Sequence, residues 1–264
     1  MTEDRLDKLD RRMDLTPRPG AAPFPRMVAA QATMEARLML RNGEQLLLAV
    51  VIPVIVLIGG VTGADHLGLD LSHPPVDVFT PGVLALAIMS TAFTSLAIAT
   101  AFERRYGVIK RLGSSPLPRS GLLAGKVGGL LVVEVLQLVV ISIVGLLLGW
   151  DPANGAAGAF LALVVGTFAF AALGLFVAGV LRAEATLAAA NLVYLLLLAG
   201  GAVVLPSSSY GSFGDVAALL PSGALGDAMR HAFLDGGVAW PELLVLLFWG
   251  ALGTVLTART FRWE

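Results

Sequence analysis

Positively charged residues alternate with long apolar runs in this chain, and that alternation constrains its fold more than any other feature. Six apolar runs of about 16–26 residues are long enough, or nearly so, to cross a hydrocarbon core of about 30 Å as helices. All 18 lysines and arginines except Arg230 lie in alternate gaps between these runs, and none falls inside a run. Because cytoplasmic loops are enriched in Lys and Arg, the pattern predicts a multi-pass membrane protein with both termini in the cytoplasm. The predicted spans are residues 46–64, 81–101, 127–149, 156–181, 185–205 and 243–258.

The composition favours a single membrane domain. Apolar residues make up 56% of the 264 residues, and the mean hydropathy is +0.82. The spans and their connections use nearly the whole chain, so we expect one all-α transmembrane domain over residues 26–264. Residues 1–25 are charged and then rich in proline, which is typical of a disordered cytoplasmic tail. The absence of cysteine excludes disulfides, thiol catalysis and thiolate metal sites.

Residues 26–44 have apolar side chains at helical spacing but are too polar to span. We predict an amphipathic helix along the inner membrane surface, and a plain extension of the first span is the alternative. Within the first span, Pro53 is expected to cause a kink, with a neighbouring helix satisfying the carbonyl that proline leaves unpaired. Pro81 suits the first turn of the second span.

One ionisable side chain, Glu134, lies within the predicted spans, with Gln137 about one turn away. Glu134 follows the start of the third span by about seven residues, or roughly 10 Å. A charged group near the bilayer centre costs about 2.5–3.5 kcal/mol, so this side chain should face protein or water. Two interpretations stay open. One is a polar contact in a substrate path or at an interface between protomers, and the other is a protonated carboxyl hydrogen-bonded to a neighbouring helix.

Motifs for covalent chemistry or nucleotide binding are lacking. The nearest string to a phosphate-binding loop, residues 121–127, has too few residues between its glycines and has Val127 where Ser or Thr would bind magnesium. The histidines lie in the outer gaps without a metal-ligand spacing or a paired serine. We therefore expect no catalytic residues, metal site or cofactor in this chain, and no nucleic-acid partner.

The gap between the second and third spans, residues 102–126, is the most specific segment. It is far longer than a turn between two helices needs. The residues predict a short basic helix from Glu103 to Leu112, stopped at Gly113 and Pro116. Such a helix is suited to binding anionic lipid or a protein partner, and a plain solvated loop is the alternative.

This segment resembles the signature of type-2 ABC transporter permeases, which has an acidic–Arg pair, a glycine, a basic residue before leucine, and then a proline. The layout is similar too, with a surface helix before six spans and short re-entrant outer helices between spans five and six. Here the outer helices would lie in residues 206–242, where residues 219–225 resemble the family's Leu-Pro stretch. Among members of the family, the chain most resembles drug-resistance permeases of the daunorubicin type. The residues at the signature positions are Glu103, Arg104, Gly107, Lys110, Arg111, Leu112 and Pro116.

The resemblance implies the permease subunit of a bacterial ABC exporter in the plasma membrane. Two copies of the chain, or this chain and a close relative, would form the substrate path among membrane lipids, with a homodimer favoured. Two separate ATPase subunits would hold ATP and Mg²⁺. It also implies that the signature residues couple to the ATPase, with Glu35 and Arg37 of the surface helix nearby. Few aromatic side chains lie in spans one, two and five to line a glycan path, which favours a hydrophobic drug or a lipid as substrate. An ion-coupled secondary carrier and a membrane assembly factor without transport are the alternatives.

Overall fold

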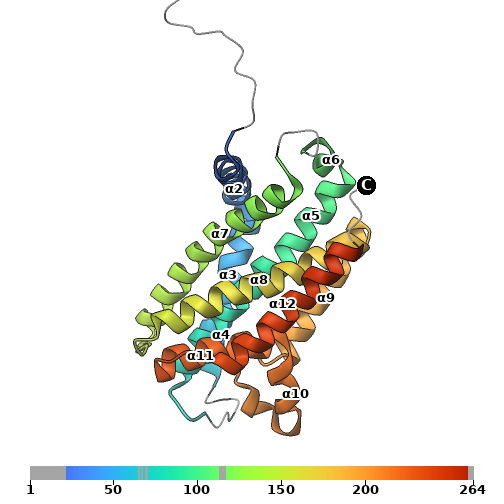
Figure 1. The fold of residues 1–264 in the computed structure, drawn as a ribbon. Coiled ribbons are helices and arrows are strands. Elements are labelled where there is room, and N and C mark those ends of the chain that lie inside the picture. The colour runs from blue at the N-terminus through green and yellow to red at the C-terminus, as the bar shows by residue number, and fades with distance from the viewer. Residues whose placement is uncertain (1–21, 65, 67, 69–70, 113–116, 261–264) are drawn as a thin grey trace, which may run out of the picture.

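The computed structural model describes residues 22–64, 66, 68, 71–112 and 117–260, and this part of the chain folds into a bundle of helices (Figure 1). Most of the predicted tail lies outside the described residues. The expected all-α membrane fold is confirmed, since five helical segments are long and apolar enough to cross a membrane. A sixth apolar helix, Ala49–Gly63, is shorter, so the count of six spans stays a prediction. The five segments are Pro75–Arg105, Ser120–Leu147, Ala156–Val180, Ala183–Gly200 and Trp240–Thr260.

The predicted surface helix is α2 (Phe24–Arg41), and a break at Asn42 separates it from α3 (Gly43–Gly63). The polar side chains of Gln31 and Glu35 are buried where α2 packs along α7 (Arg119–Leu147). By contrast, Met34 and Leu38 are exposed, so the apolar stripe of α2 faces away from the bundle. An exposed apolar stripe supports a position at the membrane surface, which stays a prediction.

The second predicted span is longer than expected. It consists of α4 (Pro75–Met89), a π-helical turn, η1 (Ser90–Ser95), and α5 (Leu96–Arg105), which follow one another without a break. The placement of Pro81 in the first turn is wrong, because Pro75 provides the same start signal earlier in the sequence. This helix is the most buried of the five candidate spans.

The remaining long helices are α7, α8 (Ala156–Val180), α9 (Ala183–Gly200) and α12 (Trp240–Thr260). Helix α7 begins well before residue 127, so Lys126 lies inside it, and the inference that no cation falls within a span is wrong. Helix α9 ends at Gly200, so the prediction that the fifth span continues through residues 201–205 is wrong. Close packing of α12 on α8 depends on small residues, since a Cβ on Gly253 would meet the backbone of α8.

The segment between α9 and α12 contains η2 (Ser207–Phe213), α10 (Gly214–Leu219) and α11 (Pro221–Asp235). Figure 1 shows α10 and α11 at one end of the bundle, and α2 and the short helix α6 (Val108–Leu112) at the other. We call the end with α2 and α6 the basic end. Helix α11 packs against α4, α8 and α12, while re-entry of these helices into the membrane stays a prediction.

Candidate functional site

A groove with several polar side chains opens on the face formed by α3, η1, α5 and α9, with a volume of about 410 Å³. Its polar side chains include Ser90, Thr94 and Ser95 of the π-helical turn, a type of turn that often occurs at functional sites. Helix α9 contributes Tyr194, which is hydrogen-bonded to Ser90, and Asn191, which is exposed. We call this the polar groove. Its other lining residues are Asn42, Ala49, Ile52, Pro53, Ile98 and Ala99.

Three helices meet at a buried ion-pair cluster near the basic end. Lys126 of α7 is only 3% exposed, and its Nζ lies 2.9 Å from Glu35 Oε1 of α2. The same ammonium forms an ion pair with Glu103 of α5, and Gln31 Nε2 donates a hydrogen bond of 2.7 Å to Glu35. We call these four residues the Lys126 cluster. One cation therefore pairs with two carboxylates and links α2, α5 and α7.

Arg104 donates hydrogen bonds to backbone carbonyls at the C-terminal end of α8. Its guanidinium donates hydrogen bonds of 2.6–2.7 Å to the carbonyls of Ala178, Gly179 and Leu181. The last carbonyls of a helix lack partners within the helix, so this side chain acts as a cap. Glu103 and Arg104 of the signature therefore both bind within the chain, and their coupling role stays a prediction.

The helix predicted from Glu103 to Leu112 is divided in two. Helix α5 ends at Arg105, and α6 begins only after Gly107. Gly107 has a φ of +69°, in the left-handed region that glycine adopts without strain, and this turn ends α5.

Among the other signature residues, Lys110 and Arg111 are exposed on α6, and Leu112 is half-buried. Gly113 and Pro116 lie outside the described residues. Arg37 is exposed on α2, on the side away from the Lys126 cluster, so the structure does not bring it together with Glu35.

Glu134 lies near the middle of the 29-residue helix α7, farther from its start than expected because the helix begins at Arg119. Its side chain is 1% exposed, and Thr167 of α8 donates a hydrogen bond of 2.7 Å to Oε2. This contact matches the interpretation of a carboxyl bonded to a neighbouring helix. Neither Glu134 nor Gln137 lines the polar groove, and their predicted place in a path or interface stays a prediction.

Whereas Glu134 contacts α8, Gln137 contacts two other elements, α3 and η1. Thr91 of η1 donates to its Oε1 at 2.8 Å, and its Nε2 donates to the carbonyl of Ala49 at 2.8 Å. That carbonyl would pair with the N–H of residue 53 in a regular helix, and Pro53 has none. The expectation that a neighbouring helix satisfies this carbonyl is confirmed.

Sequence reasoning placed Arg230 in the outer segment 206–242 but missed its role. The side chain is 4% exposed and bonds both Asp227 and the carbonyls of residues 202–205 at 2.8–3.2 Å. Burial lowers the pKa of the Arg230 guanidinium and the Asp227 carboxylate opposes this, but an arginine stays protonated in proteins. The sequence signal that could have revealed this role is that Arg230 is the one cation in the acidic outer gaps and has Asp227 three residues before it.

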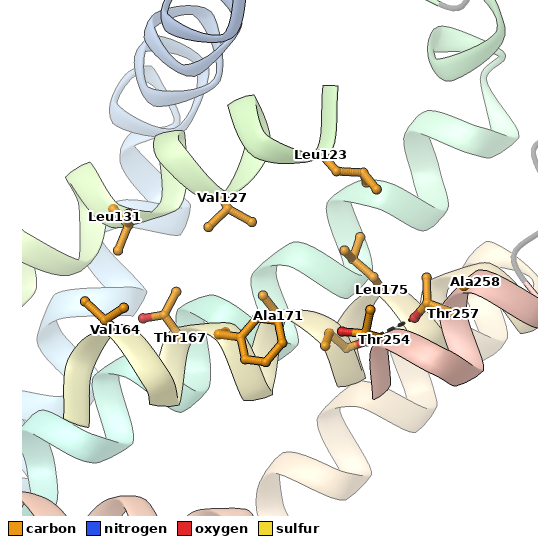
Figure 2. Close-up of a pocket in the computed structure, with 12 residues that line it drawn as sticks. Leu123, Val127, Leu131, Val164, Thr167, Ala171, Leu175, Thr254, Thr257 and Ala258 are labelled. Atoms are coloured by element: carbon orange, nitrogen blue, oxygen red, sulfur yellow. Dashed lines mark hydrogen bonds between the residues drawn. The ribbon is translucent and has the colours of Figure 1, made fainter. Parts of the chain in front are cut away.

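An apolar groove opens on another face, between α7, α8 and α12 (Figure 2). Its volume is about 490 Å³, and its polar lining side chains are Thr167, Thr254 and Thr257. Leu123, Val127 and Leu131 of α7 form the wall opposite α8 and α12. We call it the lateral groove. Its other lining residues are Val164, Phe168, Ala171, Ala172, Leu175 and Ala258.

Comparison with known proteins agrees with this architecture. The family model of the ABC-2 type transporter matches residues 29–234, well over half of the chain. No curated protein matches the chain closely enough to be significant. The matched stretch contains the polar groove, the Lys126 cluster and α6. The chain therefore belongs to the ABC-2 type transporter family and is a membrane-embedded permease of that family.

Proposed function

We propose that this chain is the permease subunit of an ATP-driven exporter in a bacterial plasma membrane. Two copies face each other across their polar grooves, two separate ATPase subunits dock at the basic end, and both termini lie in the cytoplasm. The observation that carries the proposal is the exposed polar groove on a face of membrane-spanning helices. A lone chain would present Asn191 to hydrocarbon, where an unpaired amide is costly, whereas a second copy covers it.

The lining of the polar groove supports an amphipathic substrate. Ile52, Ile98 and Pro53 supply apolar surface, while Ser95 and Asn191 supply hydrogen-bonding groups. Such a mixture suits a hydrophobic drug or a lipid better than a bare ion. Between two copies, the grooves would enclose a path along α3, α5 and α9.

The basic end supports coupling to an ATPase. Lys110 on α6 is exposed, and α6 follows directly on the helix that carries η1 and the polar groove. Arg104 and the Lys126 cluster tie the end of that helix to α2, α7 and α8. A push on α6 from a closing ATPase would therefore move these helix ends together and reshape the polar groove. In this scheme Glu35, Glu103 and Arg104 position α6, while Arg37, Lys110 and Arg111 face the ATPase.

Charge reversal of Lys110 to Glu is expected to lower the amount of ATPase that co-purifies with the permease by about tenfold, because like charges at an interface oppose binding. The tagged chain is purified from its native membranes in mild detergent and scored for a bound ATP-binding subunit and for ATP hydrolysis. Arg259→Glu, an exposed change at the same end of the bundle, is the matched control and should keep the partner. A wild-type chain without any ATPase would contradict the proposal, and full retention by Lys110→Glu would remove α6 from the contact.

Cysteine cross-linking tests the pairing of two copies. The chain contains no cysteine, so Asn191→Cys introduces a single thiol on the polar-groove face. We expect a short thiol-reactive cross-linker to produce a covalent dimer in membranes. Val135→Cys on α7, where the native side chain is 52% exposed, is the control and should stay monomeric. The reverse pattern would place the interface on α7 and contradict the proposed arrangement.

A further inference from the structure

An exposed aromatic side chain lies at the bend between α5 and α6. Tyr106 directly follows α5 and is 64% exposed. The next residue, Gly107, has a φ of +69° and turns the chain into α6. The ring therefore lies at the basic end, directly before the helix that the proposed function assigns to the ATPase contact.

Two neighbouring side chains hold the Tyr106 ring in place. It stacks on Phe102, one turn earlier in α5, with the ring centroids 6.1 Å apart and the planes at 27°. The guanidinium carbon of Arg105 lies 5.8 Å from the centroid of the Tyr106 ring. That guanidinium also forms an ion pair with Glu184 in the first turn of α9, which restricts where Arg105 points. An exposed side chain that is already restrained loses less conformational entropy when a partner covers it.

The surroundings of Tyr106 are basic. The sequence has six lysines and arginines, and no acidic residue, between Glu103 and Glu134. Of these cations, Lys110 and Arg111 are exposed on α6, shortly after Tyr106. A partner that covers the ring therefore meets positive charge beside it, and acidic groups on that partner would complement this charge.

A pocket in a protein fits this surface better than a lipid surface does. A helix that binds lipid exposes a continuous apolar face beside its cations. Among the described side chains of α6, however, Val108 and Leu112 are half-buried, and the exposed ones are cations. Tyr106 is thus a single ring among charges, an arrangement typical of protein interfaces, in which a polar rim surrounds an aromatic anchor.

We propose that Tyr106 is the anchor of the contact with the ATPase subunit, and that its ring fills an apolar pocket with an acidic rim on that subunit. This inference rests on the proposed function and adds to it the residue that contributes most to binding and the chemistry of the partner's surface. A tyrosine suits this role because it buries a large area and has only two side-chain torsion angles to restrict. Lys110 and Arg111 of α6 face the acidic rim.

The test measures the affinity of the full-length chain, in detergent, for the ATPase subunit that co-purifies with the wild type. Tyr106→Ala should weaken this affinity on the order of thirtyfold, as the loss of an interface hot spot does. Tyr106→Phe should keep most of the affinity, because an apolar pocket binds the ring and not the hydroxyl. Phe213→Ala is the matched control and should change nothing, since Phe213 is 46% exposed and lies directly before α10 at the opposite end of the bundle (Figure 1).

Salt and lipid separate the parts of the proposal. Raising the salt concentration should weaken binding of the wild type and of Tyr106→Ala by the same factor, because salt screens the rim charges and leaves the burial of the ring unchanged. Binding that does not depend on salt would overturn the acidic rim. An effect of Tyr106→Ala that appears in nanodiscs with anionic lipid, but not in detergent, would assign the ring to lipid instead.

Lys110→Glu and Tyr106→Ala together separate the anchor role from the proposed function. A wild-type chain that binds no ATPase would overturn both. An ATPase that Lys110→Glu loses and Tyr106→Ala binds as tightly as the wild type would overturn the anchor role alone. The melting temperature of Tyr106→Ala should equal that of the wild type because the ring is exposed, and a clear fall would assign the weaker binding to the fold.

Discussion

Replacing Arg230 with leucine is expected to destabilise the chain by about 3–5 kcal/mol, the usual cost of breaking a buried ionic group by removing one partner. The change leaves the Asp227 carboxylate without its cation and removes the donors that serve the carbonyls of residues 202–205. Those carbonyls belong to the non-helical segment after α9, which depends on Arg230 instead of on a regular helix. The melting temperature in detergent should fall on the order of 10 °C.

Two further variants sharpen this test. Arg259→Leu removes an exposed arginine near the end of α12 and should leave the melting temperature unchanged. Arg230→Lys keeps the charge but loses the fork of donors, so it should recover only part of the stability. A melting temperature for Arg230→Leu equal to that of the wild type would show that the carbonyls of residues 202–205 find other partners.

The approximate places of the membrane helices follow from the sequence, because an apolar run of about 20 residues has few other ways to satisfy its backbone. The ends of those helices do not. From the sequence, Lys126 marks the edge of a span, because a lone cation inside a span is costly. In the structure, α7 begins at Arg119, seven residues before Lys126. Its partners Glu35 and Glu103 are far away in the sequence, so no local pattern reveals that the charge is neutralised.

The candidate site was likewise predictable only in part. The signature around residues 103–112 was recognised, and the family match agrees with it. Which of its side chains face inward was not predictable, because Arg104 pairs with carbonyls at the end of α8, a helix distant in sequence. The π-helical turn Ser90–Ser95 has no local signal either. Its position is tied to contacts with Gln137 of α7 and with Gly174 of α8, where a Cβ would meet the backbone of Phe93.

Substituting Lys126 with methionine is expected to cost about 3–5 kcal/mol of stability, because methionine fills the space of the lysine stem but leaves two carboxylates without a cation. The melting temperature in detergent reports this loss. Lys110→Met on exposed α6 is the matched control and should have no effect on it. If the loss arises from unpaired charge, the triple variant Lys126→Met, Glu35→Gln, Glu103→Gln should regain most of the stability. A triple variant as unstable as the single one would assign the loss to packing instead.

The triple variant also separates the two roles that the Lys126 cluster has in the proposed mechanism. An uncharged cluster can still hold α2, α5 and α7 together by packing and neutral hydrogen bonds, which are weaker than charge-assisted ones. We therefore expect a folded permease that binds its ATPase and supports ATP hydrolysis, but exports less substrate for each ATP consumed. The measurement is substrate export and ATP hydrolysis in the same proteoliposomes. Export that recovers in step with the melting temperature would show that the cluster stabilises the basic end without transmitting the motion of α6.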